Sequence, residues 1–253
     1  MLGGIRDVLI ISTPQHTPLM QELLKDGSHL GMHFEYCVQE HPNGLAEAFI
    51  LGKNFVGLDN VTLILGDNLI WGHDLSTLFK ESIQRVERED NAVVFAYQVS
   101  HPENYGVIEF DENSRACSLE EKPPHPRSSY AVPGIYVYPS DVVEKAANLL
   151  PSARGELEIT DLNRLYLEEG KLHVSRLERG FAWFDMGTHD DLLEASNFIA
   201  SLERRTQQKI ACPEEIAFQN GWISRQQLED YTSTFGGSAY AKYLHKVLKR
   251  HTP

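Results

Sequence analysis

The stretch VTLILGDN, residues 61–68, guides the interpretation of the whole chain. Val61 to Leu65 form a short run of β-branched and aliphatic residues, which is typical of a strand buried on both faces of a parallel sheet. Gly66 ends this run, and Asp67 and Asn68 follow it. Ligands of open α/β sheets bind at the carboxyl ends of strands, where a carboxylate can hold Mg²⁺ against phosphates. The alternative is an ordinary turn, because glycine, aspartate and asparagine favour turns in any protein.

The segments before this run alternate between strand and helix patterns. Apolar runs at 7–13 and 33–37 predict strands, and the segment 43–57 predicts a helix. Between the strands, Thr17 is the expected N-cap of a helix that ends near Gly27. Alternating strands and helices predict a parallel sheet with right-handed crossovers.

Beyond residue 68 the pattern becomes mixed. The segment 105–123 predicts two antiparallel strands joined by the polar turn DENS. We expect Asp141, with Glu144 three residues on, to form a capping box, and Thr160 and Thr188 to cap two further helices. The remaining expectations are a helix at 73–86, strands at 91–99, 131–138, 171–177 and 181–185, and a mostly helical tail at 205–253.

Composition excludes several classes of protein. The 253 residues carry 23 basic and 36 acidic side chains, a formal net charge of −13, which argues against a nucleic-acid partner. Cys37, Cys117 and Cys212 are odd in number and lack metal-ligand spacing, which favours reduced thiols in a cytoplasmic protein. The sequence contains no apolar run of about 18 residues and no charged-then-apolar leader, so we expect neither a membrane span nor a secretion signal.

Four other stretches carry residue types suited to phosphate and sugar chemistry. The loop before a helix at 38–48 offers an amide and free backbone N–H groups, although a plain β-to-α loop fits equally well. The charges of LEEKP, 119–123, suit sugar hydroxyls and a phosphate, although a solvated charge run is the commoner meaning. Arg154 beside a glycine can bind phosphate in a bidentate way or be an ordinary surface arginine. Asp185 ends an apolar strand, as Asp67 does, and can share one cation with it.

The order and spacing of these motifs are specific. LGDN, YGVIEF, LEEKP, SARGELEITD, WFDMGTH and the later CPEEIAF closely resemble the bacterial glucose-1-phosphate thymidylyltransferase family, from Gly4 to the tail. The resemblance implies an α/β, Rossmann-like nucleotidyltransferase with a mixed, mainly parallel central sheet. It implies an enzyme that joins dTTP and glucose 1-phosphate into dTDP-glucose and pyrophosphate with Mg²⁺, supplying dTDP-rhamnose and polysaccharide synthesis. A homotetramer with a dTDP-sugar effector is also implied.

The resemblance implies roles residue by residue. It also divides the chain into a nucleotide-binding core at 1–104, a sugar-phosphate part at 105–200 and a helical regulatory segment at 201–253. The implied sites are the catalytic groups Lys122, Arg154, Asp67 and Asp185; the nucleotide contacts Gln39, Gly44 and Asp67; the sugar contacts Tyr105, Gly106, Glu121 and Gly134; the metal ligands Asp67 and Asp185; and the regulatory contacts Gly72, His73, Arg179, Glu215 and Ile216.

Three departures from the family pattern matter. The family's glycine-rich GGxGTRL loop, part of a first β–α unit of about 30 residues, does not occur in the sequence. Met186 and Pro133 stand where the family more often has threonine. One interpretation is a family enzyme shortened by a late start codon or a sequence boundary, which in-frame DNA upstream of Met1 would support. The other is a non-catalytic, nucleotide-sugar-binding regulatory homologue.

The missing motif predicts the behaviour of the 253-residue product. The loop supplies anion-binding backbone amides to the triphosphate, and its strand would lie in the middle of the sheet. We therefore expect this product to aggregate or to release no pyrophosphate from dTTP and glucose 1-phosphate, and a chain extended upstream to be soluble and active. A monodisperse short chain with ordinary turnover would contradict this expectation.

Overall fold

Val61–Ile64 forms a strand, β3, as predicted, but it lies at the edge of its sheet instead of at the centre. Its only pairing partner within residues 1–250, the part of the chain that the structure describes, is the antiparallel strand β9 (Ile135–Tyr138). Ile64 is consequently 52% exposed. An apolar run identifies a strand but not its neighbours, so the prediction of a strand buried on both faces was wrong.

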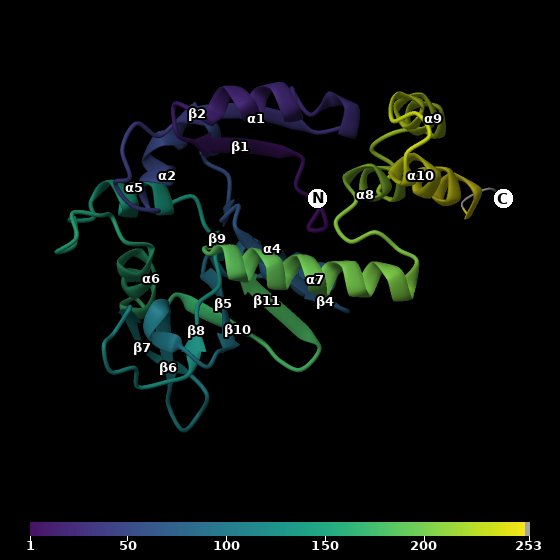
Figure 1. The fold of residues 1–253 in the computed structure, drawn as a ribbon. Coiled ribbons are helices and arrows are strands. Elements are labelled where there is room, and N and C mark those ends of the chain that lie inside the picture. Colours follow the sequence, from purple (N-terminus) through teal and green to yellow (C-terminus); the bar gives the residue numbers. More distant parts are fainter. Residues whose placement is uncertain (251–253) are drawn as a thin grey trace. The chain divides into compact units, whose positions relative to one another are not determined.

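The computed structural model divides the chain into two compact units (Figure 1). The larger unit is His41–Ala195, and the smaller one combines Met1–Glu40 with Ser196–Pro253. The units thus cut the chain at residues 40 and 195, whereas the functional division that the sequence predicts lies at 104 and 200. Each unit is described by itself below.

The larger unit contains a seven-stranded mixed sheet and a separate two-stranded ribbon. The order in the sheet is β3-β9-β5-β8-β6-β7, with β10 paired to β5, and the ribbon pairs β11 with β4. Its elements are α2 (Glu47–Leu51), α3 (Lys53–Val56), β3, β4 (Asn68–Gly72), α4 (Leu75–Glu89), β5 (Ala92–Gln98), η2 (Pro102–Asn104), β6 (Gly106–Phe110), β7 (Ala116–Glu121), β8 (Tyr130–Ala131), β9, α5 (Val142–Ala147), α6 (Ile159–Glu168), β10 (Leu172–Leu177), β11 (Phe181–Asp185) and the start of α7 (His189–Thr206).

The predicted α/β class is confirmed, but the predicted predominance of parallel pairing is not. Among the described strands only β1 with β2 and β5 with β10 pair in parallel. The other pairings are antiparallel, including the predicted β6–β7 hairpin. A short turn joins β6 to β7, and a short turn can join only antiparallel neighbours. The other antiparallel pairs join strands far apart in sequence, whose direction local patterns do not reveal. The predicted single strand at 131–138 is divided into β8 and β9 at Pro133 and Gly134.

Aromatic side chains fill the core of the larger unit. Tyr138 is fully buried, and its ring lies 5.6 Å from that of Tyr166 and 5.3 Å from that of Phe49. The buried hydroxyls are satisfied, because Tyr138 donates to Asn163 and Tyr166 to Asp141, both at 2.5 Å. Each such ring contributes about 1.5–3 kcal/mol by burial. The core fixes α6 beside β7 and α5 beside α2 (Figure 1).

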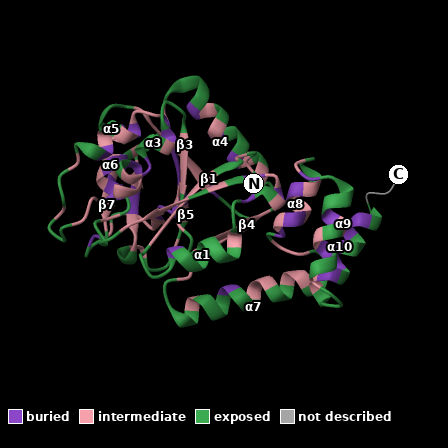
Figure 2. Cartoon of the chain, turned by 90° about the horizontal axis from the view of Figure 1, so that it is seen from above, coloured by how far each residue is buried: buried purple, intermediate pink, exposed green. Residues whose placement is uncertain are grey.

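The smaller unit is built from both ends of the chain. A two-stranded parallel sheet from the N-terminal end and three helices from the C-terminal end share one apolar core, in which Leu30 and Met32 pack with Leu228, Leu244 and Val247. In contrast α7 is mostly exposed along its length (Figure 2). The elements are β1 (Asp7–Ser12), α1 (Thr17–Leu24), η1 (Ser28–Leu30), β2 (His33–Val38), the rest of α7, α8 (Pro213–Gln219), α9 (Arg225–Thr234) and α10 (Ala239–Arg250).

Several predicted helix starts were wrong. His16 instead of Thr17 occupies the N-cap of α1, and Lys25, with φ 55°, ends that helix before Gly27. The segment 43–57 forms two short helices instead of one. Asp141 lies at the N-cap of α5 but makes no capping hydrogen bond, because its carboxylate accepts from Tyr166.

Candidate active site

Two carboxylates meet where the ribbon joins the sheet. Asp67 directly precedes β4, and Asp185 ends β11, where it is paired with Asn68 in the antiparallel ladder. The side-chain nitrogen of Asn68 donates to Asp67 Oδ1 at 2.9 Å and to Asp185 Oδ1 at 3.3 Å. The backbone N–H of Met186 also donates to the Asp67 carbonyl at 2.9 Å. Because one nitrogen contacts both carboxylates, the two strand ends bring these distant residues together.

The two aspartates differ in their environment. Burial raises the pKa of Asp185, and the nearby charges of Asp67 and Asp191 raise it further, while Lys122 acts in the opposite direction. Asp67 is exposed by comparison. A cation placed between the two carboxylates would offset their repulsion.

The donor set fits a hard cation. Carboxylate oxygens are the ligands that Mg²⁺ prefers, and this ion usually keeps several waters and takes one or two carboxylates together with substrate phosphates. Within residues 1–250 no group of three or more histidine, cysteine, aspartate or glutamate side chains is arranged to hold a metal. Two carboxylates therefore suit a cation whose remaining ligands come from substrate and water.

Aromatic residues and glycines lie beside the two aspartates. The Tyr105 ring lies 5.0 Å from that of Trp183, and burial followed by the charge of Asp185 raises the pKa of Tyr105. A methyl group on Gly134 would meet the Leu65 side chain at 2.6 Å, so only glycine fits there. The Gly134 N–H donates to Asn68 Oδ1 at 2.9 Å. These contacts join the β8–β9 turn to the Asp67 loop.

Glu121 faces the same region from the end of β7. It is the cross-strand partner of Gly106, and its Oε2 accepts a 2.5 Å hydrogen bond from the Thr160 hydroxyl. A methyl group on Gly106 would lie 2.8 Å from that hydroxyl and 3.4 Å from Glu121. Thr160 was predicted as an N-cap, but Glu158 occupies that position and the hydroxyl orients Glu121 instead. Burial raises the pKa of Tyr136, and the charges of Glu121, Asp185 and Asp67 raise it further.

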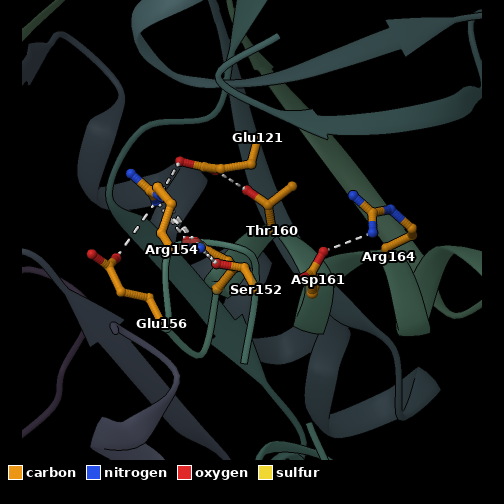
Figure 3. A network of polar contacts seen from close by, with 8 residues as sticks. Glu121, Ser152, Arg154, Glu156, Thr160, Asp161 and Arg164 are labelled. Atoms are coloured by element: carbon orange, nitrogen blue, oxygen red, sulfur yellow. Dashed lines mark hydrogen bonds and ion pairs between the residues drawn. The ribbon is translucent and has the colours of Figure 1, made fainter. Parts of the chain in front are cut away.

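Arg154 is the centre of an ionic network (Figure 3). Its Nε and Nη2 donate to Glu158 at 2.9–3.1 Å, and Nη2 lies 3.6 Å from Glu121 and 3.5 Å from Glu156. Burial raises the pKa of Glu158, but hydrogen bonds from Arg154 and Ser152 outweigh it, so the net shift is downward. This pair stabilises the fold above the unfolded-state pKa of Glu158, and the contribution disappears as the pH falls through the lowered folded-state pKa. The hydrogen bonds of Arg154 to Glu158 use Nε and Nη2 and leave Nη1 out.

Lys122 follows Glu121 in a strained backbone conformation. Its φ of 41° is in the left-handed region, which a residue with a side chain adopts at a cost of about 1–3 kcal/mol. Its N–H donates to the Tyr105 carbonyl at 3.0 Å, so the turn is held at the site. Lys122 is exposed, and its charge helps to lower the pKa of Glu158 and offsets part of the rise in the pKa of Asp185. Its charge therefore acts on both the network at Arg154 and the aspartate pair.

Of the three predicted nucleotide contacts, Gln39 lies in the smaller unit, and Gly44 and Asp67 lie in the larger one. Gln39 follows β2 in the smaller unit, where its N–H donates to the Ser12 carbonyl at 2.9 Å. Gly44 belongs to the larger unit and has φ +104°. A methyl group on Gly44 would lie 2.4 Å from the Leu157 carbonyl oxygen, because hydrogen bonds from Leu157 to Asn43 and from Ala46 to Leu157 hold the loop against that segment. Gly44 is thus required by packing against the segment that carries Arg154.

The predicted regulatory residues also divide between the units. Gly72 pairs with Phe181 at one end of the β4–β11 ribbon, so His73 and Arg179 lie at that same end. Glu215 and Ile216 belong to α8 of the smaller unit, and Glu215 accepts a 2.5 Å hydrogen bond from Tyr243. A hollow of about 460 Å³ within the smaller unit is lined by Tyr243 and by the cations Arg204, Lys209 and Lys246. Glu203 also lines this hollow and forms an ion pair with Lys209, so the net positive charge beside Tyr243 comes from Arg204 and Lys246.

Four side chains of the site were not predicted from the sequence to be functional groups. Asn68, Trp183, Glu158 and Thr160 hold the predicted residues in place. Arg154 lies before α6, so its spacing of four from Glu158 is not a helical pairing signal. Apart from the bond of Asn68 to its neighbour Asp67, the other contacts join residues far apart in sequence and leave no local pattern.

The fold and the site define a class of enzyme. Strand-end carboxylates with a lysine and an arginine, on a mixed sheet, suit transfer between phosphates, because that chemistry depends on positioning and charge neutralisation. The model of the nucleotidyl transferase family matches residues 1–201. Within residues 1–250 no helix combines the length and the apolar character that crossing a lipid bilayer requires.

Relatives narrow the assignment. The chain is 49% identical to a glucose-1-phosphate thymidylyltransferase of Neisseria meningitidis, over 99% of its own length and 86% of that protein, and 47% identical to one of Mycobacterium tuberculosis, with 99% and 86% covered. A Bacillus anthracis structure described as a glucose-1-phosphate thymidylyltransferase, in complex with sucrose, has a TM-score of 0.68 at 38% identity, over 75% of this chain and 74% of that one. UDP-glucose pyrophosphorylase with UDP-glucose, at 24% identity and TM-score 0.67 over 79% and 83%, shares the fold. The chain belongs to the glucose-1-phosphate thymidylyltransferase family, a family of enzymes.

Proposed function

We propose that the site serves the synthesis of dTDP-glucose and pyrophosphate from dTTP and glucose 1-phosphate. The observation that carries the proposal is the convergence of Asp67 and Asp185 on one amide, beside a region that bears Lys122 and Arg154. A phosphate oxygen of glucose 1-phosphate attacks the α-phosphorus of dTTP and forms the new P–O bond. The bond from the α-phosphorus to the bridging oxygen breaks, and pyrophosphate leaves with the electron pair.

Each residue has a positioning or charge-neutralising task in this proposal. Lys122 and Nη1 of Arg154 hold the sugar phosphate and offset the repulsion between the two anions. The sugar is contacted by Tyr105, Gly106, Glu121 and Gly134. The base is contacted by Gln39 and Gly44. Asp67 and Asp185 would hold Mg²⁺, which when bound neutralises the charge that develops on the phosphates. The reaction requires no nucleophilic side chain.

The sugar-phosphate half of the site lies within one unit, because Lys122, Glu121 and Arg154 all belong to the larger unit. A non-catalytic homologue that binds nucleotide sugars is the second candidate, and this half of the site favours it.

One experiment separates the two candidates. Purified protein is incubated with dTTP, glucose 1-phosphate and Mg²⁺, and dTDP-glucose is measured by ³¹P NMR. Even slow formation that requires both substrates supports the enzyme. Binding of dTDP-glucose in calorimetry without any formation supports the binding homologue. If the protein neither forms nor binds dTDP-glucose, both candidates are contradicted.

Replacing Arg154 with alanine should weaken the binding of glucose 1-phosphate. The expected loss is about 1.5–3 kcal/mol of binding free energy, the usual range for hydrogen bonds to a charged group. Calorimetry measures the loss directly. Arg164→Ala is the matched control, because that arginine pairs with Asp161 at 2.6 Å and with the Leu119 carbonyl (Figure 3 shows both arginines). Equal weakening by both substitutions would remove Arg154 from the phosphate site.

We also propose a second, regulatory nucleotide site that involves Gly72, His73, Arg179, Glu215 and Ile216. The hollow beside Tyr243, where Arg204 and Lys246 add positive charge to the Lys209–Glu203 ion pair, supports an anionic effector such as a dTDP-sugar. Calorimetry with dTDP-glucose should then count two sites per chain, and a count of one would contradict the second site.

A cytoplasmic homotetramer completes the proposal. Leu19 and Leu23, one turn apart on α1, are 60% and 73% exposed, which suits a surface that another subunit covers. Light scattering after size exclusion measures the assembly.

A further inference from the structure

Asn68 stands between the two proposed cation ligands. It is the first residue of β4, follows Asp67 directly and pairs across the ladder with Asp185. Both ends of its carboxamide are used. Nδ2 donates to Asp67 and Asp185, while Oδ1 accepts from the Gly134 N–H at 2.9 Å and from the Trp183 indole N–H at 2.7 Å. This side chain makes four hydrogen bonds.

Chemistry fixes the orientation of this carboxamide. A backbone N–H and an indole N–H can only donate, so the atom that faces Gly134 and Trp183 must be the oxygen. The nitrogen then necessarily faces the two carboxylates, which accept. An aspartate at this position would lose both donors to the carboxylates, and an apolar residue would lose all four contacts.

The contacts determine how the carboxylates are presented. Asn68 touches only Oδ1 of each aspartate, so the Oδ2 atoms stay available for a cation. The N–H groups also offset part of the repulsion between two like charges before a cation arrives. On the other side, Oδ1 accepts from Gly134 and Trp183, and the Trp183 ring lies 5.0 Å from the Tyr105 ring at an interplanar angle of 58°. One side chain therefore links the cation half of the site to the sugar half.

We propose that Asn68 is a positioning residue that sets the spacing of Asp67 and Asp185 for a divalent cation. The proposal rests on the cation site of the proposed function. Asn68 acts through the two aspartates and contacts neither the cation nor the phosphates. Outer-shell partners of this kind typically change metal affinity by about 10- to 100-fold when they are removed.

The test is the affinity for Mn²⁺ alone, measured by the electron paramagnetic resonance signal of the free ion. Asn68→Ala should weaken Mn²⁺ binding by about 10-fold or more. Asn68→Thr, which suits a strand, should weaken it too, because a single hydroxyl can donate to only one carboxylate. Asn148→Ala is the control, since that amide donates only to the Glu144 carbonyl, at 3.0 Å. Circular dichroism establishes whether each variant is folded. If Asn68→Ala does not fold, the Mn²⁺ affinity of Asn68→Thr decides the test.

The outcomes separate this inference from the function on which it rests. Mn²⁺ binding by wild type, unchanged in the Asn68 variants, would overturn the positioning role and leave the cation site intact. Unchanged Mn²⁺ binding with weaker glucose 1-phosphate binding would overturn it in favour of a direct sugar contact. A wild type that binds glucose 1-phosphate but no Mn²⁺ would overturn the cation site together with the role of Asn68.

Discussion

Asp185→Asn is expected to raise the melting temperature of the metal-free protein and to abolish its stabilisation by Mg²⁺. The raised pKa of Asp185 means that its charged form is disfavoured in the folded state, by burial first and then by Asp67. Folded protein then binds more protons than unfolded protein between the two pKa values, so stability falls as the pH rises through that window. Asparagine removes this penalty at neutral pH and still offers an oxygen to Asn68.

The stabilisation by Mg²⁺ that Asp185→Asn removes should be large. A ligand present at a hundredfold excess over its dissociation constant stabilises a protein by about 2.7 kcal/mol. Each kcal/mol shifts the melting temperature by about 2–4 °C for a chain of this size. Thermal unfolding in EDTA and in Mg²⁺ should show this shift for wild type and for Asp59→Asn, an exposed control, but not for Asp185→Asn. An unaltered Mg²⁺ response in Asp185→Asn would exclude Asp185 as a ligand.

Gly44→Ala is expected to cost the most stability of any single methyl group at the site. The left-handed φ of +104° alone costs an L-residue about 1–3 kcal/mol. The added methyl would also lie 2.4 Å from the Leu157 carbonyl oxygen, so backbone must move. We expect a loss of about 3 kcal/mol or more in the free energy of unfolding, in the upper range for point mutations.

Gly155→Ala provides the matched control for this prediction. Gly155 also has a positive φ, +79°, but nothing lies within 4 Å of an added methyl group. It should therefore show the conformational cost alone, about 1–2 kcal/mol. Urea denaturation of both variants measures the difference. Equal costs for the two would mean that the segment carrying Leu157 yields freely and that Gly44 is not held by packing.

Sequence patterns predicted most strands, although not β4, and predicted the helix starts poorly. Strands such as β1 and β5 follow from runs of β-branched residues, whose preference is set by local packing. A side chain caps a helix only when it is not hydrogen-bonded to another partner. Thr17 donates to the Thr13 carbonyl and Thr160 to Glu121, so tertiary and loop contacts outcompete the predicted caps. Thr188 caps α7 as predicted, because its hydroxyl oxygen accepts a hydrogen bond from the backbone N–H of Asp191.

The chemistry of the site was partly visible in the sequence. Strand-end aspartates have a local signature, and the order of the motifs supplied the rest. Asn68 was read only as part of a turn, because its partner Asp185 is 117 residues away. The position of β3 at a sheet edge could not be predicted either, since a strand's neighbours are chosen by topology and not by its own residues.

A crystal structure with Mn²⁺ and glucose 1-phosphate tests the central claim most directly. The account predicts one anomalous Mn²⁺ peak at bonding distance, about 2.1 Å, from carboxylate oxygens of both Asp67 and Asp185. It also predicts the sugar phosphate within hydrogen-bond reach of Lys122 and of Nη1 of Arg154. A cation bound away from these two aspartates, with the phosphate held by other residues, would contradict it.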